Sequence, residues 1–180
     1  MRELTTRPAA PIPAGVWEFA QGYAELRKGD REAAARHRDG AQNLAVSSTE
    51  MFRIHPAKKL LGILAAILDG EIARDAGNLS SAVTSFEAAV SIEDSLVWDE
   101  PEPLPFAARH WLGAALLEAG RPSDAARVYR ADLKRHPHNG WSLVGLRQAL
   151  VAQGQPAREV SEEFDRSWVR SDVWIQASRF

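Results

Sequence analysis

The sequence predicts an all-α protein, a right-handed α-solenoid of about three and a half to four helix pairs with a capping helix. Three observations support this prediction. Alanine-rich helical segments recur along the chain, and a glycine follows the first helix of each pair. Alanine and aromatic residues recur at helical spacing in the second helices. Gly120 and Gly154 are 34 residues apart, which matches one helix-pair repeat.

These repeats divide the chain as follows. We expect one domain over residues 1–180, with helix pairs at about 15–45, 60–96, 106–138 and 139–171. Residues 1–12 are expected to be flexible, and the tail 172–180 is expected to pack back through Ile175 or Phe180. Gly29 and Gly77 are 48 residues apart, and Gly77 and Gly120 are 43 apart. Both spacings exceed the 34 residues of one repeat. The additional residues predict a longer helix or an extra loop at 46–59, and a loop at 97–105.

The residues of each pair have physical roles. In the third pair, Gly113 lets two helices approach closely, and Gly120 ends the first helix in a left-handed cap. Ala125 lies where the helices cross, Tyr129 fills the space between pairs, and Pro137 stops the second helix. The other pairs carry related residues: Gly22, Gly29 and Ala34 in the first; Gly70, Gly77, Ala82, Phe86 and Ala89 in the second; Trp141, Gly145 and Gly154 in the fourth. The fourth pair is expected to be atypical because terminal units cap a solenoid.

Composition limits the function classes. The chain is 45% hydrophobic and 26% charged, with a formal net charge of −2 and a pI of about 6.2, so we expect no nucleic-acid partner. There are no cysteines, which excludes disulfides, thiolate zinc sites and a cysteine nucleophile. The most apolar stretch, residues 60–68, is too short to span a bilayer, and the first residues lack a signal-peptide core. We therefore expect a cytoplasmic protein with no membrane partner.

The third pair, WLGAALLEAGRPSDAARVYRADLKRHP, resembles the tetratricopeptide repeat. Further motifs resemble a bacterial family of tetratricopeptide proteins of unassigned role. They are GEIA (70–73), EDSL (93–96), WDEP (98–101), LGAALLEAGRPSDA (112–125), NGWSL (139–143) and SRF (178–180). The chain departs from that family in its loop, where Glu102, Leu104 and Ala107 replace expected residues, and at Glu18, where a histidine is expected. The resemblance implies the solenoid fold and leaves the function open.

A concave groove is the main predicted site, because the first helices of such pairs line the inner face. We expect the groove to have aromatic and aliphatic walls around a small polar centre. Its predicted residues are Phe19, Tyr23, Leu64, Ile67, Glu71, Arg74, His110 and Leu117. We expect this groove to bind a peptide or protein segment. The alternative is that these residues are packed core, with Glu71 and Arg74 forming a local ion pair.

The loop WDEPEPLP gives a second set of candidates, Trp98, Asp99, Glu100 and Arg109. A pairing of Glu100 with Arg109 would hold the loop over the groove, with its acids offered to a cationic ligand. The alternative is a solvated spacer whose acids favour the next helix N-terminus.

The sequence contains no recognisable catalytic or metal-binding motif. There is no G-x-S-x-G, no H-E-x-x-H and no phosphate-binding glycine loop, so we expect no enzyme and no cofactor. His136 and His138 have no third ligand at a recognisable spacing, so no metal site is predicted. Two alternatives to an interaction scaffold stay open. One is a small-ligand or metal-binding protein using Glu71, Glu100, Arg109 and His110. The other is a structural part of a larger tetratricopeptide protein, with self-association.

Overall fold

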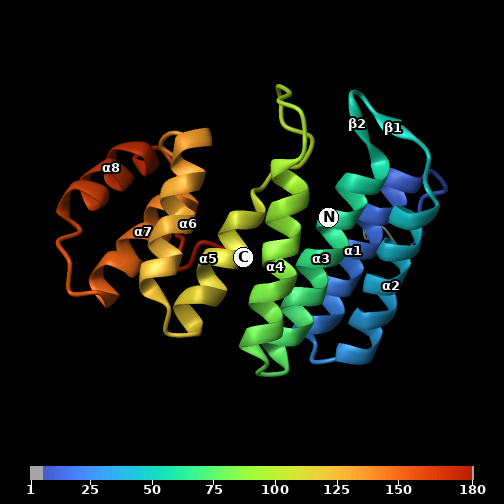
Figure 1. Cartoon of the computed structure of the whole chain (residues 1–180), viewed down its shortest axis with the longest axis horizontal. Helices are drawn as coiled ribbons and strands as arrows, with labels where there is room; N and C mark the ends of the chain where they lie inside the picture. Colours follow the sequence, from blue (N-terminus) through green and yellow to red (C-terminus); the bar gives the residue numbers. More distant parts are fainter. Residues whose placement is uncertain (1–5, 180) are drawn as a thin grey trace. The chain divides into compact units, whose positions relative to one another are not determined.

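The computed structural model describes residues 6–179 and divides into two compact units, Met1–Pro105 and Phe106–Phe180. The regular structure of the described residues is helical except for one short hairpin, so the all-α prediction is confirmed (Figure 1). The division falls between the second and third predicted helix pairs. That the two units continue one solenoid of tetratricopeptide type stays a prediction.

Unit 1 holds two helix pairs joined by the hairpin. Its elements are α1 (Pro11–Arg27), α2 (Arg31–Ser47), β1 (Met51–Phe52), β2 (His55–Pro56), α3 (Ala57–Asp75) and α4 (Leu79–Asp94). The Asp30 and Asn78 side chains cap α2 and α4 by accepting from the backbone N–H of Ala33 (2.8 Å) and Ser81 (3.1 Å). Gly29 and Gly77 precede these caps at φ of 87° and 78°, a region that favours glycine. The predicted turn between the helices of each pair is therefore confirmed.

The core of unit 1 is organised around α3, which packs on α1, α2 and α4. Its large aliphatic side chains are almost completely buried: Leu60, Leu61, Ile63, Leu64, Ile67 and Leu68. Gly70 faces the Phe86 ring of α4 so closely that a Cβ at this glycine would lie 2.4 Å from Phe86 Cε1. The pairing of a small residue with an aromatic ring, which the repeat pattern predicted, thus fixes how α3 crosses α4.

Unit 2 also holds two helix pairs, α5 (Ala108–Glu118) with α6 (Pro122–Arg135) and α7 (Gly140–Ala152) with α8 (Arg158–Trp168). Helices α5 and α6 lie within residues 106–138, and α7 and α8 lie within residues 139–171, the ranges in which the sequence predicts two helix pairs. Gly120 and Gly154 have positive φ, and Asn139 caps α7. The Tyr129 ring of α6 lies between α5 and α7, where a Cβ at Gly113 or Gly145 would come within 2.3 or 2.2 Å of its Cζ.

Two segments add to or differ from what the sequence predicted, and a third agrees with it. The surplus at 46–59 forms a two-stranded antiparallel hairpin, in which Met51 faces Pro56 and Phe52 faces His55, rather than a longer helix. Helix α1 begins at Pro11, inside the range expected to be flexible, while residues 1–5 lie outside the described range. Ile175 is buried, as predicted for the tail, and Phe180 lies outside the described residues.

No helix within residues 6–179 has both the length and the apolar character needed to cross a membrane.

Candidate functional site

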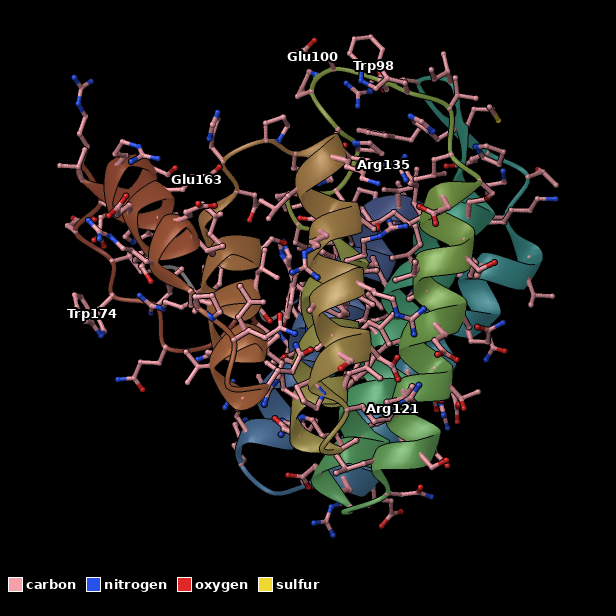
Figure 2. All side chains as sticks on the ribbon, turned by 60° about the vertical axis from the view of Figure 1, so that its left-hand side comes forward. Trp98, Glu100, Arg121, Arg135, Glu163 and Trp174 are labelled. Carbon is pink, nitrogen blue, oxygen red and sulfur yellow. The ribbon has the colours of Figure 1, made fainter. Side chains whose placement is uncertain are left out.

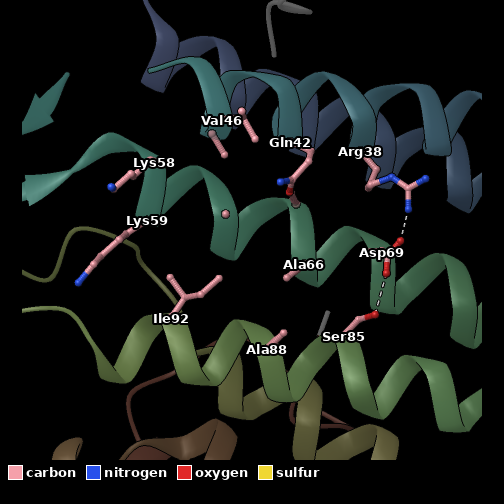
Figure 3. A pocket seen from close by; sticks show the side chains of 13 residues that line it. Arg38, Gln42, Val46, Lys58, Lys59, Ala66, Asp69, Ser85, Ala88 and Ile92 are labelled. Atoms are coloured by element: carbon pink, nitrogen blue, oxygen red, sulfur yellow. Dashed lines mark hydrogen bonds and ion pairs between the residues drawn. The ribbon is translucent and has the colours of Figure 1, made fainter. Parts of the chain in front are cut away.

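A groove of about 670 Å³ runs along α3, between α2 and α4 of unit 1 (Figure 3). It is lined by residues of all three helices: Arg38, Gln42, Ala45, Val46, Lys58, Lys59, Gly62, Ala65, Ala66, Asp69, Ser85, Ala88 and Ile92. The lining is therefore largely apolar, with charged side chains only at the two ends of the groove in Figure 3.

The floor of the groove consists of small residues of α3. Gly62, Ala65, Ala66 and Asp69 have the spacing i, i+3, i+4 and i+7, which places them on one face of the helix. The large aliphatic residues of α3 occupy its other faces and form the core. Because Gly62, Ala65 and Ala66 carry almost no side-chain volume, the space between α2 and α4 stays open above them.

One end of the groove is closed by charged and polar groups that satisfy one another. Asp69 of α3 accepts from Arg38 of α2 and from the hydroxyl of Ser85 of α4, the latter at 2.7 Å (Figure 3). Arg38 also donates to Asp39 at 2.7 Å. This end therefore ties the three helices together and carries little net charge.

The other end is basic. Lys59 is half-buried and donates from Nζ to the carbonyl of Ser95 at 2.8 Å, while Lys58 is exposed. The lining contains three cationic residues and one carboxylate, Asp69, which is already paired with Arg38. An occupant with acidic groups at the lysine end would therefore match the charge of the groove.

None of the residues predicted for the concave groove lines the groove observed in unit 1. Of the six predicted residues in unit 1, Arg74 is half-buried and five are buried with exposed fractions of 9% or less: Phe19, Tyr23, Leu64, Ile67 and Glu71. His110 is also buried, and Leu117 is half-buried, but both belong to unit 2. A groove shared by all eight residues spans two units and so stays a prediction, while the burial of the unit 1 members favours the packed-core alternative.

The predicted polar centre is a satisfied internal cluster. The guanidinium of Arg74 donates to both carboxylate oxygens of Glu71 at 3.0 Å, and the hydroxyl of Tyr23 donates to Glu71 at 3.1 Å. Glu71 is 1% exposed. A buried carboxylate needs such partners, so the cluster ties α1 to α3.

The acidic loop is anchored to the hairpin. Asp99 accepts from Arg53 at 2.7 Å and lies 3.2 Å from Nε2 of His55, while Arg53 also donates to the carbonyl of Pro101 at 2.5 Å. Trp98 and Glu100 project outward, and Trp98 is 76% exposed (Figure 2). Asp99 is thus engaged within unit 1. Arg109 belongs to unit 2, so its pairing with Glu100 stays a prediction.

The sequence did not reveal Arg53 and His55 as partners of the loop. Arg53 stands in the hairpin turn with φ of 55°, where glycine or asparagine is the usual residue. The turn therefore has no sequence signal, and the two strands are only two residues long each.

Unit 2 contains a buried polar cluster around Asp132 of α6, which is 0% exposed. Its carboxylate accepts from Ser142 Oγ at 2.5 Å and from His136 Nδ1 at 2.8 Å, and His110 Nε2 lies 3.4 Å away without hydrogen-bond alignment. Burial acts to raise the pKa of Asp132, but His110, His136 and Ser142 outweigh it and hold that pKa well below its usual range. The cluster therefore joins α5, α6 and α7 around an ionised carboxylate.

The histidine pair does not converge on one point. His136 bonds Asp132, whereas His138 Nδ1 lies 2.9 Å from Glu163 of α8. Within residues 6–179, no group of three or more His, Asp or Glu side chains is arranged to hold a metal ion.

No protein-family model matches this chain, and a search of curated proteins finds no significantly similar one. The resemblance to tetratricopeptide proteins therefore rests on the motifs quoted above and stays a prediction.

Proposed function

We propose that this protein is a non-enzymatic interaction scaffold of tetratricopeptide type, and that the α2–α3–α4 groove binds an amphipathic helical segment of a partner protein. The observation that carries this proposal is the groove itself, an open and largely apolar channel with small residues of α3 along its floor. Amphipathic helices bind such grooves with their apolar face inward.

The dimensions of the groove fit a short helix. Along α3 it extends from Lys58 to Asp69, which corresponds to about 16 Å at the helical rise of about 1.5 Å per residue. A partner helix of about three turns matches this length. Since Gly62 and Ala66 offer almost no side chain, the partner's own apolar side chains would supply the missing volume.

The charges of the groove favour an acidic partner. Lys58 is exposed at one end, whereas Arg38 at the other end is already paired with Asp69. A helix with carboxylates near the lysine end gains favourable electrostatics there. The lining has few convergent polar groups that would hold a small polar ligand, so a protein segment fits the site better.

The test is affinity co-purification from the native host, read by mass spectrometry. Ala66→Trp fills the floor of the groove, and Lys58→Glu reverses the charge at its end. A partner that uses the groove is retained by the wild type and lost by both variants. Lys134→Glu is the matched control, because Lys134 is an exposed lysine of unit 2.

The controls make the result decisive. Circular dichroism establishes that each variant is folded. If the folded Ala66→Trp and Lys58→Glu variants retain every partner of the wild type, the groove is not the binding site. Loss of the partner by Lys134→Glu as well would indicate a nonspecific effect of charge and would also contradict the proposal.

A further inference from the structure

A short non-helical segment, residues 175–179, returns from the end of α8 to the face formed by α5 and α7; we call it the returning segment. Two of its side chains are buried, Ile175 at 7% and Ser178 at 1% exposed. The two residues on either side of Ile175, Trp174 and Gln176, are exposed, and Trp174 projects outward in Figure 2. The segment is thus held by side chains three positions apart.

Polar contacts fix the returning segment to three helices. Ser178 Oγ donates to the backbone carbonyl of His110 at 2.8 Å and lies 2.7 Å from the hydroxyl of Tyr129. The amide of Gln148 donates to the carbonyl of Gln176 at 2.6 Å. The guanidinium of Arg179 pairs with Glu118 at 3.0 Å.

The helices of unit 2 are shaped to make the central contact. Gly113 of α5 and Gly145 of α7 leave space for the distal end of the Tyr129 ring, whose hydroxyl reaches Ser178. Burial raises the pKa of Tyr129 well above its usual range, so the hydroxyl keeps its proton for hydrogen bonding. The α5–α7 face therefore presents a buried hydroxyl and a helix carbonyl to one serine.

The connection between α8 and the returning segment is exposed throughout residues 169–174. Val169, Val173 and Trp174 are 76%, 54% and 86% exposed. The connection is non-helical, and Val173 accepts from Trp168 Nε1 at 2.7 Å. Release of the returning segment from the face would therefore not require a helix to unfold.

We propose that the α5–α7 face is a second binding site, for a non-helical protein segment with an aliphatic residue three positions before a serine that is followed by arginine. The returning segment is its intramolecular occupant and competes with a partner segment of the same pattern. This site is separate from the α2–α3–α4 groove, and its test does not depend on that groove.

The first experiment measures binding of a fluorescent peptide, DVWIQASRF (residues 172–180), to the full chain by anisotropy. The released variant Ile175→Asp/Ser178→Asp disfavours the intramolecular segment and leaves the face unchanged. We expect it to bind the peptide at least about tenfold more tightly than the wild type, because an attached competitor acts at millimolar effective concentration. A peptide carrying the same two substitutions is the control and is expected not to bind.

Two results would overturn the proposal. One is a folded released variant that binds the peptide no better than the wild type. The other is equal binding of the wild-type and doubly substituted peptides, which would exclude the serine and aliphatic anchors.

A second measurement uses a nearly unchanged chain and decides the question if the released variant does not fold. Because the sequence has no cysteine, Ser178→Cys introduces a single thiol. We expect it to react with a thiol reagent at least about tenfold more slowly than Gln176→Cys, since reaction requires local opening. Excess peptide should accelerate the reaction at position 178 and leave that at 176 unchanged. An unaltered rate at 178 would mean that the segment is a fixed part of unit 2.

Discussion

The helix pair α3–α4 of unit 1 and the pair α5–α6 of unit 2 share one packing pattern but carry their buried polar groups at different positions. The offset of 43 residues that relates Gly77 to Gly120 also relates Gly70 to Gly113, and both glycines face an aromatic ring. At the same offset, three apolar residues of unit 1 have polar counterparts in unit 2: Ile67 and His110, Phe86 and Tyr129, Ala89 and Asp132.

This difference shows how the same helix-pair packing can hold different neighbouring segments. Buried polar groups require partners, so Asp132 and Tyr129 fix the positions of Ser142 on α7 and Ser178 in the returning segment. The three apolar counterparts in unit 1 need no such partners, and a groove stays open beside α3. Unit 2 thus holds a segment of its own chain, whereas we propose that unit 1 binds one from a partner.

The largest expected effect comes from breaking the polar core of unit 2. Asp132→Ala removes the acceptor shared by His136 and Ser142 and the carboxylate beside His110, so the free energy of unfolding should fall by about 3–5 kcal/mol. Urea unfolding followed by tryptophan fluorescence measures this change. The double variant His110→Ile/Asp132→Ala recreates the Ile67 and Ala89 pair of unit 1 and should recover part of the loss. A single-variant loss below about 1 kcal/mol would contradict the role given to Asp132.

Substitution of the two equivalent glycines by alanine tests the packing of a glycine against an aromatic ring, which both units share. Gly70→Ala and Gly113→Ala should each destabilise the protein, because overpacking costs about 1–3 kcal/mol and outweighs a helix-propensity gain of about 1 kcal/mol. Gly62→Ala is the control, since its Cβ would meet only Ile92 Cδ1, at 3.4 Å. Thermal unfolding should rank both variants below this control; equal stability of all three would refute the ring-against-glycine packing.

The hydroxyl of Tyr129 is a further difference between the two units, because Phe86 stands at the equivalent position of unit 1. Tyr129→Phe makes unit 2 resemble unit 1 at the position of Phe86 and removes one hydrogen bond, so a loss of about 1 kcal/mol is expected. The Ser178→Cys thiol should also become more reactive in this background. Unchanged stability together with an unchanged thiol reaction rate would show that the hydroxyl does not hold the returning segment.

The smallest effect concerns alkaline pH. The raised pKa of Tyr129 means that the folded chain keeps this proton after the unfolded chain has begun to lose it near pH 10. The stabilisation is therefore complete below about pH 10 and declines as the pH rises further. The stability of the wild type should fall more steeply than that of Tyr129→Phe between about pH 9 and 11. Parallel curves would contradict the burial of an un-ionised phenol.

Much of the helical structure was predictable from the sequence because it depends on local signals. Gly29, Gly77, Gly120 and Gly154 mark turns with positive φ, each between two successive helices. The hairpin was not predictable, because Arg53 occupies a turn position without the usual residue type.

The candidate functional site was harder to predict from the sequence than the fold. Residues such as Tyr23 and Glu71 follow the same helical periodicity whether they line a groove or fill a core, and the structure buries both. The observed groove depends on residues that offer almost no side chain, such as Gly62 and Ala66, whose importance emerges only when α2 and α4 are placed beside them. The partners of Asp99 and Ser178 are far apart in the chain and also required the tertiary structure.

The most direct test of the scaffold proposal is photo-cross-linking in the native host from position 88, where a photoreactive amino acid replaces the groove residue Ala88. An exposed position of α6, Arg130, carries the same amino acid as the control. We predict a partner cross-linked from position 88 and not from 130, with the cross-link in an amphipathic, acidic helical segment. No cross-linked partner at 88, or the same partner equally from both positions, would contradict the proposal.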